Sequence, residues 1–170
     1  MARLFFAIWP ERATGKELAH VGESLAQLAG GRPMPVEKIH MTLAFLGALD
    51  EERTGAAVAA AGPIRSPEVR MTVDTVGSFR RSKVGWAAPA QTVESLVQLQ
   101  STLATRLREH GFTLEDRAFT PHITLVRKLE RPVPRAPMPA IEWRSRALTL
   151  VETTGDGRYE IRESWELRSV

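Results

Sequence analysis

The sequence predicts an α+β fold in which two similar lobes of antiparallel sheet, with flanking helices, face each other across a central groove. Two observations support this fold class. The expected strands are short and often joined by hairpins, which is typical of antiparallel sheets rather than of a doubly wound parallel sheet. In addition, the pattern His-apolar-Thr-Leu occurs once in each half of the chain, at residues 40–43 and 122–125. We therefore expect a single bilobal domain over residues 1–170, with one copy of the pattern in each lobe.

The first half of the chain contains two expected strands and two expected helices. The first strand spans about residues 3–9, and the second, residues 39–46, carries the first His-Thr pair and ends at Gly47. Between these strands, apolar residues recur at helical spacing before a glycine stop, at Leu18, Val21, Leu25 and Leu28, followed by Gly30 and Gly31. Asp50 is a suitable N-cap for a short alanine-rich helix that ends near Ala61.

The second half begins with a hairpin and continues with the most regular helix of the chain. Residues 69–76 alternate between apolar and polar, and a turn at 80–83 joins them to a strand at 84–88. The helix that follows has leucines on one face and a glycine at its C-terminal end, at Leu96, Leu99, Leu103, Leu107 and Gly111. The second His-Thr strand, residues 121–127, comes next.

Four prolines separate this strand from a final hairpin. They lie at positions 132, 134, 137 and 139 and predict a stiff, extended connector rather than a folded element. Two strands then follow, at about residues 141–152 and 158–168, joined by the turn signal Gly155-Asp156-Gly157.

The composition excludes several classes of protein. The 170 residues include no cysteine, so disulfides, thiolate metal sites and a thiol nucleophile are ruled out. The apolar start is too short for a signal peptide and no run reaches membrane-spanning length, so we expect a cytoplasmic protein that does not bind membranes. The net charge of +3 favours a phosphate-bearing partner but does not indicate a general nucleic-acid binder.

Both His-Thr patterns lie in runs rich in apolar and β-branched residues, which predicts strands. Side chains two apart on a strand share a face, so His40 should project with Thr42, and His122 with Thr124. The residues between and after them should point into the core: Met41, Leu43 and Phe45 behind the first pair, and Ile123 and Leu125 behind the second. Two imidazoles, each beside a hydroxyl, would then meet across the groove.

A single histidine on a strand is usually structural, but the repetition argues against that interpretation. From the composition, two such patterns among four histidines are expected in roughly one of a thousand sequences. The other two, His20 and His110, lie in helix-like stretches without this context, and we expect them to be surface residues. The duplicated pattern therefore marks a candidate active site.

Two histidines beside two threonines suit the chemistry of phosphodiesters. Histidine titrates near pH 6.5, so one imidazole can deprotonate a nucleophile while the other protonates the leaving oxygen. The threonine hydroxyls can hold the non-bridging oxygens, on which charge increases in the transition state. Such a site needs no metal and no other cofactor.

The two motifs, His40-Met41-Thr42-Leu43 and His122-Ile123-Thr124-Leu125, resemble the signature of the 2H phosphoesterase superfamily. Residues 3–10, 43–47 and 119–125 resemble in particular its bacterial and archaeal RNA 2′,3′-cyclic phosphodiesterase branch, whose members are also called 2′-5′ RNA ligases. The resemblance implies a bilobal α+β fold with a pseudo-twofold axis. It also implies metal-independent hydrolysis of 2′,3′-cyclic phosphodiester ends of RNA to 2′-phosphomonoesters.

The resemblance assigns roles residue by residue. It implies that His40 is the proton donor, that His122 is the proton acceptor, and that Thr42 and Thr124 bind the phosphate. The substrate partners would be RNA ends or nucleotides that carry a 2′,3′-cyclic phosphate, and we expect a monomer. Arg127 is a further candidate for phosphate binding, because relatives lead us to expect a basic residue there. On an ideal strand, however, it would face away from the groove unless a bulge or the strand end turned it.

Two other aromatic positions admit more than one interpretation. Phe79 and the basic turn at 80–83 could guide a nucleotide strand by stacking and charge, or the turn could simply be solvated. Phe5 could stack on a base, although a phenylalanine in an N-terminal strand is more often part of the core.

Three alternatives to the hydrolase are open at this stage. Ligation of a 2′,3′-cyclic end to a 5′-hydroxyl would use the same groups, so the sequence cannot separate it from hydrolysis. A non-catalytic RNA-end binder would be expected to carry a damaged motif, and both motifs are intact. A metal protein would need three or four ligands, and neither histidine has another at ligand spacing.

Overall fold

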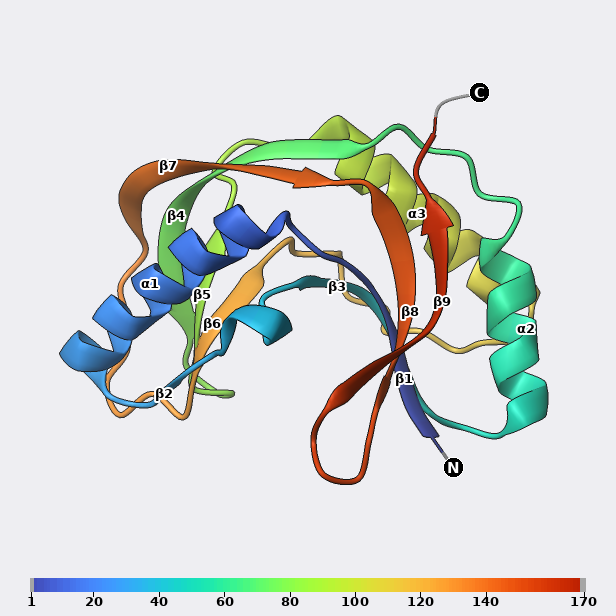
Figure 1. Ribbon diagram of the computed structural model, residues 1–170, viewed down its shortest axis with the longest axis horizontal. Helices are drawn as coiled ribbons and strands as arrows, with labels where there is room; N and C mark the ends of the chain where they lie inside the picture. The colour runs from blue at the N-terminus through green and yellow to red at the C-terminus, as the bar shows by residue number, and fades with distance from the viewer. Residues whose placement is uncertain (1, 169–170) are drawn as a thin grey trace.

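The structure is a computed structural model that describes residues 2–168, and it consists of two sheets with helices packed around them (Figure 1). The four-stranded sheet has the order β3 (Met41–Leu49), β1 (Ala2–Ile8), β8 (Ala147–Thr153), β9 (Tyr159–Glu166). The five-stranded sheet has the order β2 (Arg32–Pro33), β6 (Ile123–Arg127), β5 (Val84–Ala88), β4 (Val69–Phe79), β7 (Ala136–Ser145). The helices are α1 (Arg12–Ala29), the 3₁₀ turn η1 (Val36–Lys38), α2 (Glu51–Ala61) and α3 (Glu94–Glu109). All strand pairs in this part of the chain are antiparallel, so the predicted α+β class is confirmed.

A strand, a helix and a motif-bearing strand follow one another twice along the chain. The first copy is β1, α1 and β3, the second is β5, α3 and β6, and in each copy the motif strand pairs with the strand before the helix. The helices are exchanged between the copies, because α1 packs on β6 and α3 packs on β3. Strands β3 and β6 also contact each other, so the fold brings the two motifs together near the middle of the molecule (Figure 1).

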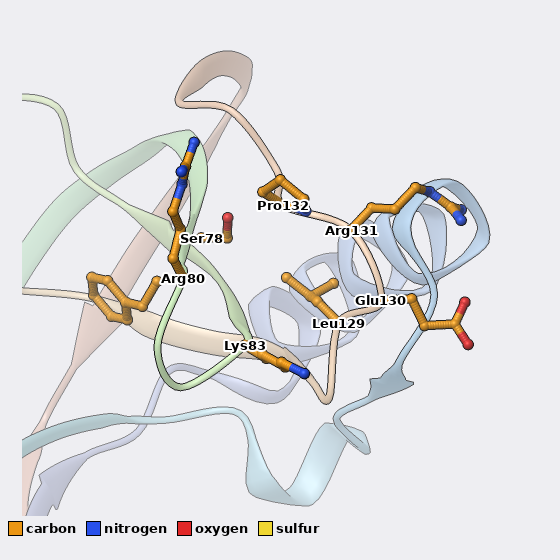
Figure 2. Close-up of a pocket in the computed structure, with 8 residues that line it drawn as sticks. Ser78, Arg80, Lys83, Leu129, Glu130, Arg131 and Pro132 are labelled. Atoms are coloured by element: carbon orange, nitrogen blue, oxygen red, sulfur yellow. The ribbon is translucent and has the colours of Figure 1, made fainter.

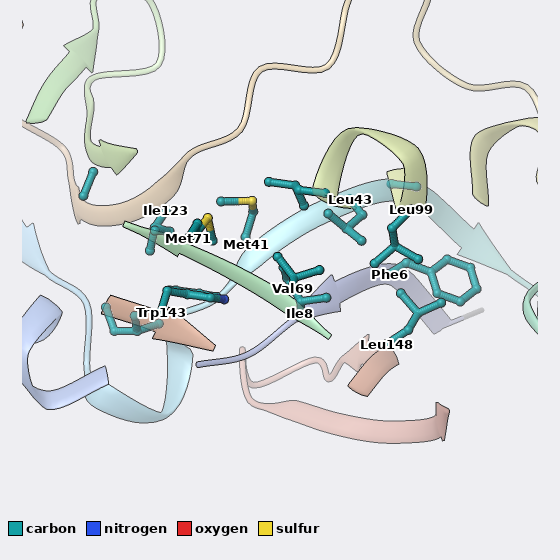
Figure 3. Close-up of a cluster of buried hydrophobic side chains, with 14 of the residues drawn as sticks. Phe6, Ile8, Met41, Leu43, Val69, Met71, Leu99, Ile123, Trp143 and Leu148 are labelled. Atoms are coloured by element: carbon teal, nitrogen blue, oxygen red, sulfur yellow. The ribbon is translucent and has the colours of Figure 1, made fainter. Parts of the chain in front are cut away.

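The two sheets share one continuous core, part of which is shown in Figure 3. Met41 and Ile123, the residues between the histidine and the threonine of each motif, are both fully buried in it. Phe6 and Ile8 come from β1, and Trp143 comes from the far edge of the five-stranded sheet. Because the core holds each motif from behind, the histidine and threonine side chains must point away from it, as the alternation predicts.

Each motif strand contains a β-bulge at the leucine of its motif. Residues 42 and 44 of β3 pair with consecutive residues of β1, so Leu43 is the extra residue. Residues 124 and 126 of β6 pair with consecutive residues of β5, so Leu125 is the extra residue there. A bulge shifts the two-residue alternation by one position, so the side chains that follow it exchange faces.

This shift overturns the predicted position of Phe45, and it removes the objection that Arg127 would face away from the groove. The predicted core position of Phe45 is wrong, because its side chain is 73% exposed. On β6, Val126 takes the buried face together with Ile123, and Arg127 is exposed. Phe45 and Arg127 both lie five residues after their histidine, and the bulge turns both away from the core.

The bulge in β6 is held by tight packing of α1. A Cβ atom on Gly22 would lie 2.8 Å from the carbonyl oxygen of Leu125, so a side chain there would force the helix away from the strand. The same oxygen accepts a hydrogen bond of 2.8 Å from the backbone N–H of Met34. Leu28 does not share this buried face and is 74% exposed, whereas the residues that α1 buries along its length include Leu18, Gly22, Leu25 and Ala29.

The remaining helix ends follow their sequence signals, whereas one strand end does not. Asp50 caps α2 by accepting a hydrogen bond of 2.8 Å from the N–H of Arg53, and Gly111 follows α3 with a φ of +84°. Gly47 does not end its strand: β3 continues to Leu49, beyond a second register shift. None of the helices between residues 2 and 168 is both long and apolar enough to cross a membrane.

Two predictions about the last third of the chain are wrong. Part of the proline-rich segment is not a connector, because residues 136–140 form the first half of β7 and pair with β4. This is possible because β7 is an edge strand with a register shift, where proline removes no necessary hydrogen bond. The expected strand at 141–152 is two strands, since the chain leaves the five-stranded sheet after Ser145 and enters the four-stranded sheet at Ala147.

Candidate active site

His40 lies between η1 and β3, immediately before the strand begins. Its Nδ1 atom is 2.7 Å from the backbone carbonyl oxygen of Lys38, and its Nε2 atom is 3.0 Å from the hydroxyl of Thr42. Because a carbonyl oxygen can only accept a hydrogen bond, Nδ1 must carry a hydrogen. Nε2 is therefore the nitrogen of His40 that can take up or release a proton.

His122 repeats this arrangement on the five-stranded sheet. It lies immediately before β6, and its Nδ1 atom is 2.9 Å from the carbonyl oxygen of Thr120, again two residues earlier. Phe79 meets the imidazole edge to face, with the ring centroids 5.0 Å apart. The duplicated motif thus produces a duplicated imidazole geometry, in which a backbone carbonyl holds Nδ1 and leaves Nε2 as the reactive atom.

Three aromatic rings form a cage around His40, which leaves it only 8% exposed. Trp9 stacks on the imidazole at 4.8 Å, Phe5 lies at 5.2 Å, and Tyr159 meets it edge-on at 5.5 Å. The ammonium group of Lys38 lies over the Tyr159 ring and also donates a hydrogen bond to the carbonyl of Gly157. Lys38 therefore docks the β8–β9 turn against η1 and helps to close the cage.

The surroundings of His40 favour its neutral form. Burial in the cage lowers the pKa of His40 from 6.5 to about 4, and the nearby charges of Arg127 and His122 act in the same direction. The hydrogen bond to the Lys38 carbonyl opposes this shift but is a smaller effect. His122 is only half-buried, and within residues 2–168 it lacks such a cage. The structure thus distinguishes two histidines that the sequence leaves nearly equivalent.

This difference predicts a pH-dependent stability. Because the pKa of His40 is about 4 in the folded protein and near 6.5 in the unfolded chain, only the unfolded chain binds the proton between these values. The contribution should be complete above pH 6.5 and lost as the pH falls to 4, in total about 3 kcal/mol or roughly 10 °C in Tm. When the pH is lowered from 6.5 to 4, the Tm of the wild type should fall by this amount more than the Tm of His40→Gln. Parallel pH profiles for the two proteins would contradict the assignment.

The other predicted site residues, Thr42, Thr124 and Arg127, lie on the same two strands that follow the histidines. Thr42 contacts His40 directly, and Thr124 is half-buried on β6, opposite Trp86 of β5. Arg127 is exposed, and its charge is near enough to His40 to lower the pKa of that imidazole. The bulge at Leu125 supplies the change of face that an ideal strand would deny to Arg127.

A groove of about 820 Å³ opens beside the motifs, with Thr42 and His122 in its walls. His40 is not in these walls, but it contacts the groove residue Thr42. Phe45 and Phe79 border the groove as well, and its opposite side is formed by α3 and the segment 114–120. Its volume lies in the upper part of the range that is usual for small-molecule sites, roughly 300–1,000 Å³.

The turn between β4 and β5 separates this groove from a smaller cavity of about 300 Å³ (Figure 2). Arg81 and Ser82 face the groove, whereas Arg80 and Lys83 face the smaller cavity. Phe79 borders both. Only half of the basic turn can therefore take part in a site that includes His122.

Sequence reasoning missed the cage residues Trp9 and Tyr159. Trp9 follows the first strand directly, but Tyr159 reaches His40 from a hairpin more than a hundred residues away, and no sequence signal points to that contact. Phe5 is buried as expected, although it packs beside His40 rather than in the main core. His20 is exposed, and His110 is half-buried against the end of α3; neither lines the groove. Among residues 2–168, no three His, Cys, Asp or Glu side chains are grouped as metal ligands would be.

Comparison with known proteins gives consistent results along most of the chain. The sequence model of the 2′-5′ RNA ligase superfamily matches residues 13–157. An RNA 2′,3′-cyclic phosphodiesterase of Escherichia coli K12 is 35% identical over 141 residues, which cover 83% of this chain and 80% of that protein. An RNA 2′,3′-cyclic phosphodiesterase of Thermotoga maritima is 32% identical over 131 residues, covering 74% of this chain and 69% of the relative.

Solved structures show the same fold. The crystal structure of E. coli LigT in complex with 3′-AMP superposes with a TM-score of 0.88 and 32% identity, covering 98% of each chain. The complex of E. coli LigT with phosphate superposes with a TM-score of 0.83 and 30% identity, covering 99% of this chain and 98% of the other. The fold of this chain is therefore shared with E. coli LigT, a protein whose structures contain 3′-AMP and phosphate.

Proposed function

The chain belongs to the 2′-5′ RNA ligase superfamily, and from this membership we propose that it is an RNA 2′,3′-cyclic phosphodiesterase. It opens the cyclic phosphate at RNA ends, or in nucleotides, to a 2′-phosphomonoester. The observation that carries the proposal is the pair of histidines, one before each motif strand. Each is held at Nδ1 by the carbonyl two residues earlier, and each presents Nε2 for proton transfer.

The reaction joins a water molecule to the cyclic phosphorus. His122 Nε2 accepts a proton from the water while the water oxygen forms a bond to phosphorus. The bond between phosphorus and the 3′-oxygen breaks, and Nε2 of His40 donates a proton to that oxygen. The products are a 3′-hydroxyl and a 2′-phosphate, with a proton gained by His122 and one lost by His40, so exchange with solvent restores the starting state.

The donor role requires His40 to be protonated when the substrate is bound, although it is neutral in the free protein at pH 7. The bound phosphodiester carries a negative charge, which favours the protonated imidazole. It also offsets the charge of Arg127, one of the causes that lower the His40 pKa in the free protein. An acid with a low pKa then releases its proton readily to the leaving oxygen.

Thr42, Thr124 and Arg127 stabilise the phosphate in this scheme. The Thr42 hydroxyl is already next to His40 Nε2, where a non-bridging oxygen can accept its hydrogen. Thr124 lies on β6 two residues after His122, as Thr42 lies on β3 two residues after His40, and the guanidinium of Arg127 offsets the charge that develops on the phosphate oxygens. Residues 1–170 act as one catalytic unit, to which each sheet contributes one His-Thr motif; a monomeric state and a cytoplasmic location stay predictions.

The test is a reaction with an RNA oligonucleotide that ends in a 2′,3′-cyclic phosphate, in the presence of EDTA. We expect full turnover and a product with a 2′-phosphate only, because both proton transfers are assigned to histidines. Mass spectrometry detects the addition of water to the cyclic phosphate. Digestion with a phosphatase, compared with digestion by an enzyme that acts only on 2′-phosphates, identifies the isomer. A 5′-hydroxyl oligonucleotide added to the same reaction reveals ligation as a longer product.

Several outcomes would reject the proposal. A 3′-phosphate product would mean that the bond from phosphorus to the 2′-oxygen breaks, not the bond to the 3′-oxygen. Activity that EDTA abolishes and zinc restores would contradict the two-histidine mechanism. Tight binding of the cyclic end without turnover would indicate an RNA-end binder instead.

A further inference from the structure

We propose that the side chains of Lys38 and Tyr159 form a clamp that positions the imidazole of His40, so that both residues act in the reaction through His40. The Lys38–Tyr159 clamp joins the segment before the first motif to the β8–β9 hairpin. Neither residue lines the groove, so both are positioning residues rather than catalytic ones. The inference rests on the proposed function, since it concerns how the same site is held in its working geometry.

The short turn η1 holds His40 and part of its cage through two consecutive backbone carbonyls. The carbonyl of Glu37 accepts a hydrogen bond of 3.3 Å from the indole N–H of Trp9, which stacks on the imidazole. The carbonyl of Lys38 accepts the hydrogen bond from Nδ1 of His40. The orientation of His40 therefore depends on the position of η1.

The side chain of Lys38 ties η1 to the hairpin that carries Tyr159. Its ammonium group donates a hydrogen bond of 2.5 Å to the carbonyl of Gly157, and it lies 4.9 Å from the centre of the Tyr159 ring. Within residues 2–168, this hydrogen bond is the one that reaches the turn at 154–158 from outside the hairpin. One residue thus contacts His40 by its backbone and fixes the opposite side of the cage by its side chain.

The turn that precedes Tyr159 is stiff, so it moves as a unit. The N–H of Thr154 donates to the carbonyl of Arg158 at 2.8 Å, and the N–H of Gly157 donates to the carbonyl of Thr154 at 2.9 Å. Asp156 and Arg158 form a salt bridge of 2.8 Å within the turn. Because these bonds are internal to the turn, the contact with Lys38 is what sets the distance between the turn and η1.

Tyr159 presses on His40 with its ring rather than with its hydroxyl. The two rings meet at 84°, with the centroids 5.5 Å apart, and Tyr159 also meets Phe5 edge-on at 5.3 Å. Its hydroxyl makes no hydrogen bond to another residue between positions 2 and 168. A phenylalanine at position 159 should therefore keep the clamp, whereas an aliphatic residue should not.

The second motif lacks a comparable clamp in the part of the chain that the structure describes. The residue two positions before His122 is Thr120, and its carbonyl accepts the hydrogen bond from Nδ1 as that of Lys38 does in the first motif. Thr120, however, lines the groove, and Phe79 is the aromatic ring that meets His122. The clamp can therefore influence one of the two proton transfers without the other.

The electrostatics of His40 provide a direct measure of the clamp. Burial is the main cause of its low pKa of about 4, and the charges of Arg127 and His122 act in the same direction. The charges of Asp156 and Arg158 on the hairpin turn are paired with each other. Opening the cage admits water to the imidazole, which favours the protonated form and raises the pKa toward its ordinary value.

The first experiment measures the pKa of His40 by NMR titration, with its ring signal assigned by its loss in His40→Gln. Lys38→Met removes the ammonium group and keeps most of the stem, whereas Tyr159→Leu removes the ring and keeps the charge of Lys38. In both variants the pKa should rise by about one pH unit, part of the way to 6.5. Tyr159→Phe is the matched control and should leave it unchanged.

The second experiment is a double-mutant cycle on turnover of a 2′,3′-cyclic phosphodiester. Lys38→Met and Tyr159→Leu should each lower kcat by about tenfold, because a proton donor that is out of line transfers its proton less efficiently. KM should stay unchanged, since neither side chain lines the groove. Combined with His40→Gln, the same substitutions should cause no further loss, because the group that they position is already absent.

Two more variants serve as controls of the kinetic result. Lys38→Arg keeps the charge and a hydrogen-bond donor over the Tyr159 ring, and it should restore both kcat and the pKa of His40. Lys16→Ala removes an exposed lysine from α1 and should leave both at the wild-type values. Thermal melts at pH 7.5 show which variants are folded, and if Lys38→Met is not, the comparison of Tyr159→Leu with Tyr159→Phe carries the test.

Several results would overturn the inference. A loss of kcat that is equally large with and without His40 would show that the clamp supports the fold and not His40. A rise of the pKa in Lys38→Met but not in Tyr159→Leu would be an effect of the lysine charge, and it would also reject the clamp. If the wild type does not hydrolyse the cyclic phosphodiester, the proposed function fails, whereas the titration of His40 still decides whether the clamp encloses it.

Discussion

Replacing His122 or His40 with alanine is expected to lower kcat/KM for a 2′,3′-cyclic phosphodiester by roughly a hundred- to ten-thousandfold. Each substitution removes the Nε2 atom that transfers a proton, and no other described side chain repeats the geometry of a histidine held at Nδ1 beside a motif threonine. Steady-state rates on purified variants measure the loss. Thermal melts at pH 7.5 show whether the fold is retained.

The chain offers matched controls for both substitutions. His20→Ala removes an exposed histidine from α1 and should leave turnover unchanged. Because His40 is enclosed by three aromatic rings, His40→Gln accompanies His40→Ala and keeps most of the side-chain volume in the cage. If a folded His40 or His122 variant turned over substrate at nearly the wild-type rate, the two-histidine mechanism would be wrong.

A substrate with an activated leaving group should separate the roles of the two histidines. A nitrophenolate leaves without a proton, so a general acid contributes little to its departure, whereas the attacking water still needs a base. With a nitrophenyl phosphodiester that binds in the same orientation, His40→Ala is expected to stay within about tenfold of the wild type. His122→Ala should still lose at least about a hundredfold. The release of nitrophenolate, followed by absorbance, measures both.

The low pKa of His40 is also compatible with a role as the base, and a pH profile cannot decide between the two assignments. The substrate with an activated leaving group is therefore the necessary test. An active form with His40 neutral and His122 protonated has the same total charge as the reverse form, so both give the same bell-shaped dependence. The reverse order of losses would make His40 the base, which its neutrality in the free protein would explain directly. Equal losses would indicate that both imidazoles mainly stabilise charge in the transition state.

The sequence by itself determined the elements of the site that depend on local pattern. The alternation around each motif correctly placed Met41 and Ile123 in the core, which leaves the histidine and threonine of each motif on the opposite face. Short-range signals also identified the cap at Asp50 and the glycine after α3. The antiparallel α+β class followed from short hairpin-linked strands. These features rest on contacts within a few residues, and periodicity reports such contacts directly.

Only the tertiary structure decided where side chains point beyond each motif leucine and what surrounds His40. A bulge depends on how a strand pairs with its neighbour, so the sequence of β3 alone could not show that Phe45 leaves the core. The prolines of β7 are likewise compatible with a strand only because that strand lies at a sheet edge. The cage around His40 joins Trp9 to Tyr159, which lie at opposite ends of the chain. Burial depends on such long-range packing, and for this reason the fold rather than the motif lowers the pKa of His40.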